Sequence, residues 1–199
     1  MRDRYDRAMI IIALFATATI ALEAFVCLLI ADFLAGLLHW AEDTWLAPGA
    51  SPLLDKWVVL PNIDHHRRPG AIREGSYWVN NQVSIFLAAV PLLLLVGLNV
   101  HAWEPYLVIL LASQSNQFHM WAHCANPPAL VKLLQNSGLL QRAALHAVHH
   151  KRPYGVRYCT TTSYLNPILD RIDFWRGLER IAVRLGATVY RATPVRQGY

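Results

Sequence analysis

Eight of the chain's nine histidines stand in four short clusters, and each cluster lies at or just beyond an apolar segment. Imidazole is a common protein ligand of iron, zinc and copper. Eight imidazoles exceed the coordination sphere of one metal ion, so the pattern predicts two metals. The fold must therefore bring four separated segments to one place. The clusters are His39, with Asp43 four residues later, His65 with His66, His119 with His123, and His146, His149 and His150.

The composition favours a small membrane protein. Of 199 residues, 55% are hydrophobic and only 16% are charged, which is too apolar for an ordinary soluble domain. We expect one membrane-embedded domain over residues 1–199. The net charge of +5 is unevenly distributed, with no Lys or Arg between Val83 and Met120 and most of them in the histidine-bearing segments. Because positive segments usually stay in the cytoplasm, we expect the histidine side there.

The basic charge also bears on binding partners. A basic surface facing a membrane attracts anionic lipid headgroups. The chain has no basic stripe with interleaved aromatic residues, so we do not expect nucleic acid as a partner.

The apolar segments predict an all-α fold with about three long transmembrane helices. Residues 8–41 would form about 50 Å of helix, longer than a hydrocarbon core of ~30 Å, so this helix should cross the membrane and project beyond it. A polar, irregular stretch over residues 49–80 should follow. We expect two further spans and then a cytoplasmic-side helical cap with amphipathic helices. These segments are 83–100 and 106–124 for the spans, 125–199 for the cap, and 139–150 and 164–185 for the helices within the cap.

Three spans would bring all four histidine clusters to one side. The first span ends at His39 and Asp43, and the loop with His65 and His66 stays there. The second span leaves and the third returns with His119 and His123, before the last cluster. This topology puts the N-terminus on the opposite side, although its three arginines would favour the cytoplasm.

Local geometry supports metal binding by the clusters. On a helix His39 and Asp43 share a face, as do His119 and His123. His146, His149 and His150 would spread over roughly 100° of a helix, and an irregular loop could point His65 and His66 inward. His101 lies in the short opposite loop and is excluded.

Two polar residues beside the clusters have alternative roles. Asp43 either binds a metal or supports His39 and ends the helix. Asn116, one turn before the third cluster, either holds a metal-bound water or makes a hydrogen bond between helices.

Other catalytic motifs are missing from the sequence. It contains no HExxH, GxSxG or Walker A motif, and no GxGxxG fingerprint for a dinucleotide. A redox reaction would therefore take its electrons from a separate carrier, either a ferredoxin or a cytochrome b5-like protein, with its reductase.

Four strings resemble the lipid desaturase family, which includes plasmanylethanolamine desaturase and a chloroplast desaturase that acts on the palmitate of phosphatidylglycerol. The resemblance covers about residues 30–180 and keeps the order of all four clusters. The chain departs from the family at its N-terminus, where the animal enzyme has an additional span, and at Ser163 and Tyr164, where a Gly-Trp pair is expected. The strings are DFLAGLLHWAEDTW (32–45), DHHRRP (64–69), SNQFHMWAHC (115–124) and LHAVHHKRPYGVRYCTTTSYLNPILDRIDFWRGLE (145–179).

The resemblance implies a non-haem diiron centre that uses O2 and two electrons to remove two hydrogens from a lipid chain. For an ether phospholipid such as plasmanylethanolamine, the product is the vinyl ether of a plasmalogen. The eight clustered histidines and Asp43 would be the ligands. Basic residues beside the clusters would either contact the lipid phosphate or be ordinary positive charges on the cytoplasmic side. These residues are Arg67, Arg68, Lys151 and Arg152.

The ligands alone leave other functions open. A phospholipid acyl-chain desaturase or a lipid hydroxylase would use the same diiron apparatus. A membrane haem-binding electron carrier belongs to a different class and needs only two to four histidines. A non-catalytic metal-binding protein would keep the site without turnover.

Overall fold

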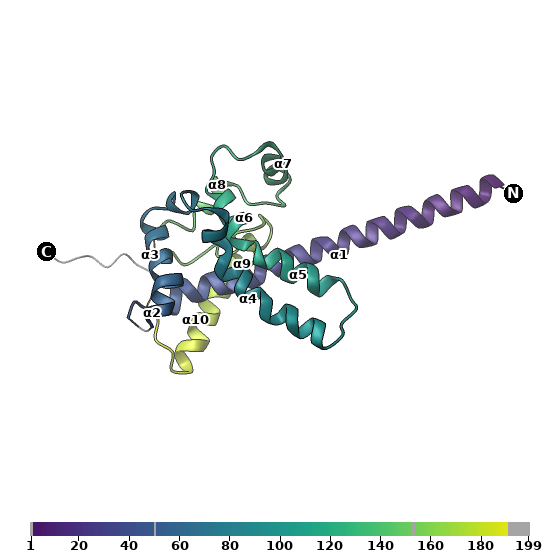
Figure 1. Ribbon diagram of the computed structural model, residues 1–199. Helices are drawn as coiled ribbons and strands as arrows, with labels where there is room; N and C mark the ends of the chain where they lie inside the picture. Colours follow the sequence, from purple (N-terminus) through teal and green to yellow (C-terminus); the bar gives the residue numbers. More distant parts are fainter. Residues whose placement is uncertain (1, 50, 153, 191–199) are drawn as a thin grey trace.

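A computed structural model describes residues 2–49, 51–152 and 154–190. Helices joined by turns build all of this part of the chain, and it contains no strand. The all-α prediction is therefore confirmed. One very long helix, α1, carries a cluster of shorter helices at its C-terminal end, and a helical hairpin runs beside its middle (Figure 1). The last predicted cap residues, 191–199, lie outside the described residues, as does residue 153.

Helix α1 (Arg2–Trp45) is a single helix of 44 residues, about 66 Å long. The sequence predicts it because no glycine or proline interrupts residues 8–35. Thr17 and Thr19 satisfy their hydroxyl groups inside the helix, by donating to the carbonyls of Ala13 at 2.9 Å and Phe15 at 3.0 Å. The helix ends at Trp45, shortly before Pro48 and a left-handed Gly49 (φ 94°), as the sequence indicates.

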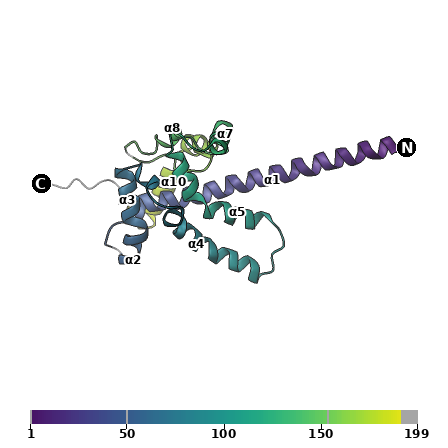
Figure 2. The same ribbon diagram turned by 45° about the horizontal axis from the view of Figure 1, so that its top comes forward.

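Only the C-terminal half of α1 packs against the rest of the chain. The Cys27 thiol lies 3.7 Å from the carbonyl of Glu104, the first residue of α5 (Glu104–Ser113). The preceding part of α1 extends alone beyond the hairpin in both orientations (Figure 1, Figure 2). Its apolar side chains are exposed, among them Phe15 at 72%. By length and composition, α1 and α4 (Tyr77–Gly97) are the two described helices that could cross a membrane.

The segment before the second cluster is helical, which corrects the prediction of an irregular stretch. Helix α2 (Pro52–Leu54) continues into the π-helical turn η1 (Asp55–Val59) and then α3 (Leu60–Arg67). Pro61 explains both the weak sequence signal and the wide turn. It lacks an N–H, and its ring would clash with the preceding carbonyls of a regular α-helix. His65 and His66 therefore stand on a helix. A 3₁₀ turn, η2 (Ala71–Arg73), leads on to α4.

The predicted third span is a broken helix. Helix α4 begins six residues earlier than the expected 83, and α5 runs back beside it. The chain then breaks at Gln114 before α6 (Ser115–Ala122). The fully buried Asn81 supports this break, because its side-chain oxygen accepts a hydrogen bond from the Gln117 N–H at 3.0 Å. The ten residues of α5 are about 15 Å long, too short to cross a membrane as one helix.

The cap contains four short helices: α7 (Ala129–Ser137), α8 (Ala143–His146), α9 (Leu165–Arg171) and α10 (Phe174–Arg184). The helix predicted over 139–150 is reduced to α8, and a tight turn follows it. The helix predicted over 164–185 is present as α9 and α10, and Asp173 in a left-handed conformation (φ 53°) separates them.

The cap is fixed to α1 by a buried polar contact and a small core. Asp32 is fully buried and accepts hydrogen bonds from the backbone N–H groups of Thr161 and Thr162 at 2.8 and 2.9 Å. Nearby, Gly36 permits a close approach, since a Cβ there would lie 2.7 Å from the sulfur of Cys159. The core around this contact comprises Tyr158, Cys159, Leu169 and Trp175.

Candidate metal centre

All nine predicted ligands lie at the junction of α1, α3, α6 and the α8 turn. They form two groups, and within each group the potential ligand atoms lie within 4.8 Å of one another. We call the first the five-histidine group. It consists of His65, His119, His123, His146 and His150. We call the second the aspartate group. It consists of His39, Asp43, His66 and His149.

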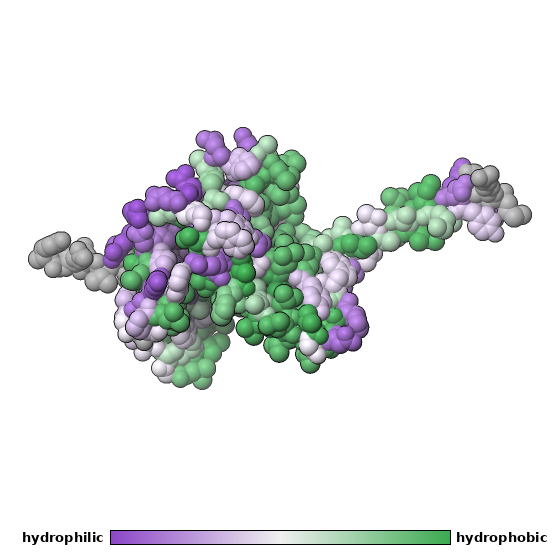
Figure 3. Space-filling model, in the orientation of Figure 1, coloured by the Kyte–Doolittle hydropathy of each residue, from purple (hydrophilic) through white to green (hydrophobic). Residues whose placement is uncertain are grey.

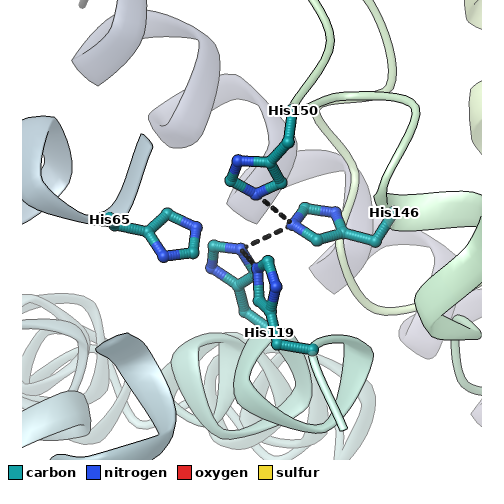
Figure 4. Close-up of side chains that lie close together, drawn as sticks. His65, His119, His146 and His150 are labelled. Carbon is teal, nitrogen blue, oxygen red and sulfur yellow. Dashed lines mark hydrogen bonds between the residues drawn. The ribbon is translucent and has the colours of Figure 1, made fainter. Parts of the chain in front are cut away.

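In the five-histidine group the ring nitrogens point at one another. The Nε2 atom of His146 lies 2.8 Å from Nε2 of His119 and 3.1 Å from Nε2 of His150, and His123 approaches His119 at 3.2 Å. Figure 4 shows the rings converging from different segments of the chain. A neutral imidazole has one donor and one acceptor nitrogen, so several converging Nε2 atoms cannot all be satisfied by each other. A cation among them would satisfy every lone pair.

In the aspartate group a carboxylate oxygen faces two imidazole nitrogens. Asp43 Oδ2 lies 3.3 Å from Nε2 of His149 and 3.7 Å from Nε2 of His39. Asp43 Oδ1 is bound separately, with His66 Nε2 at 2.9 Å and the Asn62 amide donating at 2.8 Å. The side chain of Asp43 is therefore held by two neighbours, which leaves Oδ2 directed at the other histidines.

Backbone carbonyls fix the ring orientation of His39 and His149. The Nδ1–H of His39 donates to the carbonyl of Tyr158 at 3.0 Å, and that of His149 donates to the carbonyl of Val156 at 2.9 Å. In the neutral ring, each hydrogen bond makes Nε2 the nitrogen with the free lone pair, and this nitrogen faces Asp43. Metal-binding histidines in proteins are commonly held in this way through their other nitrogen.

The buried polar atoms fit metal ions. Within the described residues, His39 Nε2, His149 Nε2 and Asp43 Oδ2 are buried without a hydrogen-bond partner, although they face one another. Both ring nitrogens of His65 are also buried without a hydrogen-bond partner. Two lone pairs and a carboxylate oxygen repel one another in a dry site unless a positive charge lies between them. Nitrogen with one carboxylate is a donor set suited to iron or zinc.

Electrostatics keeps His146 and His150 of the helical cap in the ligating form. Burial, followed by the neighbouring imidazoles, lowers the pKa of His146 and His150 below the usual value for histidine. The same causes lower the pKa of His65 on α3. Neutral imidazole binds metals, whereas the protonated ring has no free lone pair.

The two groups adjoin. The ring centres of His39 and His119, one from each group, are 5.3 Å apart, and those of His66 and His150 are 5.1 Å apart. Helix α3 supplies consecutive histidines to different groups, and the turn after α8 does the same. The prediction of a helix under the last cluster is wrong beyond His146, because His149 and His150 lie in this turn. His123 is also outside a helix, because it directly follows Ala122, the last residue of α6.

The remaining predicted site residues lie outside the two groups. The amide of Asn116 donates to the backbone carbonyl of Asn80 on α4 at 2.8 Å, which is the expected hydrogen bond between helices. Arg68 is exposed and pairs with Asp64 at 2.6 Å. Arg67, Lys151 and Arg152 are exposed beside the histidines. His101 is exposed in the turn between α4 and α5.

A cavity of about 380 Å³ adjoins both groups. His39, His65 and His119 form part of its wall, together with Asn116. Its apolar lining includes Leu38 of α1 and Leu87 of α4, which are also on the outer surface with 54% and 50% exposure. Its polar lining includes Glu42, Lys56, Asn62 and Asp64.

Sequence reasoning missed several residues of the site. Asn62 is the clearest case, because it stands near the second cluster but carries no pattern of its own. The carbonyl groups of Val156 and Tyr158 have no side-chain signal at all. Glu42 adjoins the predicted Asp43 and is visible only as an acidic residue at the end of an apolar helix.

The fold and the site together define an all-helical protein with a buried, histidine-rich site suited to two metal ions. Residues 28–192 match the lipid desaturase domain family. The chain belongs to this family.

Several known proteins are similar to the chain. A plasmanylethanolamine desaturase from Myxococcus xanthus is 32% identical over 160 residues, which are 77% of this chain and 57% of that protein. Plasmanylethanolamine desaturase 1 from Mus musculus is 32% identical over 164 residues, 76% of this chain and 60% of the relative. The chloroplastic fatty acid desaturase 4 of Arabidopsis thaliana is 30% identical over 171 residues, 81% of this chain and 51% of the relative.

The chain thus spans between half and three fifths of the length of these three relatives. No solved structure shows a significant match to it.

Proposed function

We propose that the chain is a multi-pass membrane diiron lipid desaturase that introduces a double bond near the headgroup of a phospholipid chain. The proposed substrate is plasmanylethanolamine, and the product is plasmenylethanolamine, a plasmalogen. The observation that carries this proposal is the cavity beside the two ligand groups. Its lining combines Leu38 of α1 and Leu87 of α4, which also lie on the outer surface, with the charged residues Glu42 and Lys56.

The cavity matches the shape of the reaction. A lipid chain entering between Leu38 and Leu87 would come from the bilayer, and its headgroup would rest near Lys56. Along α1 the lining residues Ala35, Leu38, His39 and Glu42 cover about 10 Å. His39 lies between the apolar residues and Glu42 in this series, so the carbons nearest the headgroup would be the ones beside it.

Nine convergent donors support two iron ions. The five-histidine group would hold one, and the aspartate group would hold the other through three histidines and Asp43. Bound iron would supply the activation of O2. Two hydrogens from the lipid, two electrons from an external carrier and two protons together reduce O2 to two molecules of water.

The chain's own residues would position the reactants. Asn62 and His66 hold Asp43, while the carbonyls of Val156 and Tyr158 hold the two histidines opposite it. Asn116 lines the cavity near His119, and its amide oxygen is available to orient a bound water. The apolar wall excludes bulk water from the reacting carbons.

The membrane orientation is also part of the proposal. Most of the hydrophilic residues gather at the end of the molecule away from the free half of α1, others lie at the N-terminal end of that helix, and apolar side chains cover much of the hairpin (Figure 3). We place that hydrophilic end, with the metal centre, on the cytoplasmic side. Helices α1 and α4 cross the bilayer, and the broken α5–α6 arm returns to the site.

The electron donor would be a ferredoxin or a cytochrome b5-like protein with its reductase. Arg67, Lys151 and Arg152 are exposed next to ligands, where they could receive an acidic carrier. None of these three residues lines the cavity, so they are placed to meet a carrier rather than the phosphate of a lipid bound there.

An acyl-chain desaturase is the second candidate, because the Arabidopsis relative bears the name of a fatty acid desaturase. A lipid hydroxylase would use the same ligands. A haem-binding electron carrier fits poorly. A haem offers two axial positions, and further imidazoles of a five-histidine group would occupy the place of its ring.

Lipid mass spectrometry tests the proposal. Cells that express the chain and are fed an alkyl ether phospholipid should accumulate a product lighter by two hydrogens, with an acid-labile vinyl ether. An acid-stable product of that mass would indicate a double bond elsewhere, and a product heavier by one oxygen would indicate a hydroxylase. If the lipid stays unchanged in cells that supply iron and an electron carrier, the proposed function is wrong.

A further inference from the structure

Two charged side chains of the cavity wall, Glu42 and Lys56, take part in no ion pair within the described residues. Glu42 follows His39 by one turn of α1, and Lys56 comes from η1. Neither forms an ion pair with another described residue. The Lys56 ammonium instead lies 4.8 Å from the centre of the Trp57 ring. The third charged residue of the cavity wall, Asp64, is paired with Arg68.

The position of Glu42 makes its isolation costly. Its carboxyl group is half-buried beside Asp43 and lines the cavity. A carboxylate removed from water is destabilised unless a cation or hydrogen-bond donors reach it. The described part of the chain supplies neither to Glu42, so a bound molecule with a positive group would compensate it.

We propose that Glu42 and Lys56 form a binding subsite for a zwitterionic phosphoethanolamine headgroup. Lys56 binds the phosphate, and Glu42 binds the primary ammonium. This inference rests on the proposed function and specifies the headgroup for which the cavity is built. One negative and one positive group on the ligand meet one positive and one negative group on the wall.

The chemistry of Glu42 distinguishes a primary amine from other headgroups. A primary ammonium offers three N–H donors to a carboxylate. A quaternary choline has none and is better suited to an aromatic face. A glycerol headgroup carries no positive charge and leaves Glu42 uncompensated. Ethanolamine phospholipids should therefore bind in preference to both.

The subsite would also set which carbons react. Glu42 lies three residues beyond His39, a rise of about 4.5 Å along α1. A headgroup anchored there leaves the first carbons of the lipid chain beside His39 and His119, which also line the cavity. The remainder of the chain would extend past Leu38 toward the bilayer.

Lipid binding can be measured without turnover. We suggest native mass spectrometry of the full chain in detergent with three diester phospholipids of identical acyl chains, carrying ethanolamine, choline or glycerol headgroups. The wild-type chain should retain the ethanolamine lipid about tenfold better than the glycerol lipid, as expected for one charge-assisted contact. Glu42→Gln should make the two equal.

Substitutions of Lys56 test the proposed contact with the phosphate. Lys56→Met should weaken the retention of all three lipids to a similar degree, because all three carry the phosphate, and Lys56→Arg should restore it. The matched controls are Glu74→Gln and Lys132→Gln, which remove exposed charges that do not line the cavity. Both controls should retain lipids like the wild-type chain.

The outcomes separate the subsite from the proposed function. The subsite is wrong if Glu42→Gln keeps the wild-type preference, or if the wild-type chain retains the choline lipid best. A chain that binds the ethanolamine lipid selectively through Glu42 but desaturates no lipid would support the subsite and overturn the function. A chain that desaturates lipids without preference for the headgroup would support the function and overturn the subsite.

Discussion

Thr162 binds Asp32 through two donors, its backbone N–H at 2.9 Å and its hydroxyl at 2.7 Å, although 130 residues separate them in the chain. Thr161 adds a third hydrogen bond to the same carboxylate. This contact fixes the 156–162 segment against α1. The same segment supplies the carbonyl groups that orient His39 and His149. Asp32 therefore positions the aspartate group from more than one turn of helix away.

Replacement of this carboxylate should damage both stability and metal binding. Asp32→Ala leaves three donors unsatisfied, and it should lower the free energy of unfolding by at least ~2 kcal/mol. Thermal unfolding in detergent measures this loss, and metal analysis should show less bound iron. The control is Asp6→Ala, which changes an exposed carboxylate on the free half of α1. If Asp32→Ala keeps the wild-type melting temperature and iron content, the contact does not have this role.

Protein purified under iron-replete conditions should contain about two irons per chain, because nine convergent donors exceed one coordination sphere. Asp43→Asn should retain less iron than the wild-type chain, since Oδ2 would lose its full negative charge. Metal analysis by mass spectrometry decides the number. A single zinc per chain, with no iron and no activity after iron addition, contradicts the diiron proposal.

Single alanine substitutions of the ligands should abolish turnover. We expect this for His66, His119, His146 and His150, with a loss greater than the 10–100-fold typical of residues that only support ligands. His101→Ala should keep wild-type turnover, because His101 is exposed in the turn between α4 and α5. Product formation is measured on variants with wild-type expression and melting behaviour. If His101→Ala is as inactive as His150→Ala, the placement of that turn is wrong.

The sequence predicts α1 and the convergence of the ligands well, and the reasons are local. Long apolar periodicity without glycine or proline defines α1. Histidine is rare enough for four clusters to indicate a common site. The helical state of 52–67 could not be predicted as well, since polar residues and Pro61 obscure the pattern that an ordinary helix would show.

The broken third span and the cavity depend on contacts between distant residues. Asn81 replaces a helical hydrogen bond of Gln117 across 36 positions, and only the packed structure shows this pairing. Asn62 and Lys56 also gain their places through packing of α3 and η1 on α1. No spacing rule in the sequence links any of these residues to the histidines.

Asn62 offers a test of how Asp43 is held. Its amide donates to Asp43 Oδ1 at 2.8 Å, opposite the oxygen that faces His39 and His149. Asn62→Leu keeps the size of the side chain but removes the donor, so turnover should fall 10–100-fold while the fold is retained. Asn62→Asp should be worse than Asn62→Leu, because it brings a second negative charge to Asp43. Equal activity of all three proteins would show that this hydrogen bond is unimportant.

Turnover should depend on electrons from a separate protein. The purified chain with lipid, O2 and a nicotinamide should not turn over until a separate carrier and its reductase are added. Desaturation consumes two electrons beyond those of the lipid, and the sequence has no GxGxxG fingerprint and no CxxC motif for a cluster. Sustained turnover with the nicotinamide alone, in a preparation free of reductase, would contradict this prediction.

The dependence of turnover on salt concentration shows whether the carrier docks on a charged surface or on a neutral one. Arg67, Lys151 and Arg152 are exposed beside ligands and should attract an acidic carrier. Raising the ionic strength shortens the reach of these charges, so turnover at low carrier concentration should slow. A triple substitution of these residues by glutamine should reproduce the slow rate at low salt and respond little to added salt. Because none of the three lines the cavity, retention of the lipid by the triple variant should match the wild-type chain. A parallel loss of lipid retention would instead mean that the basic surface binds lipid headgroups.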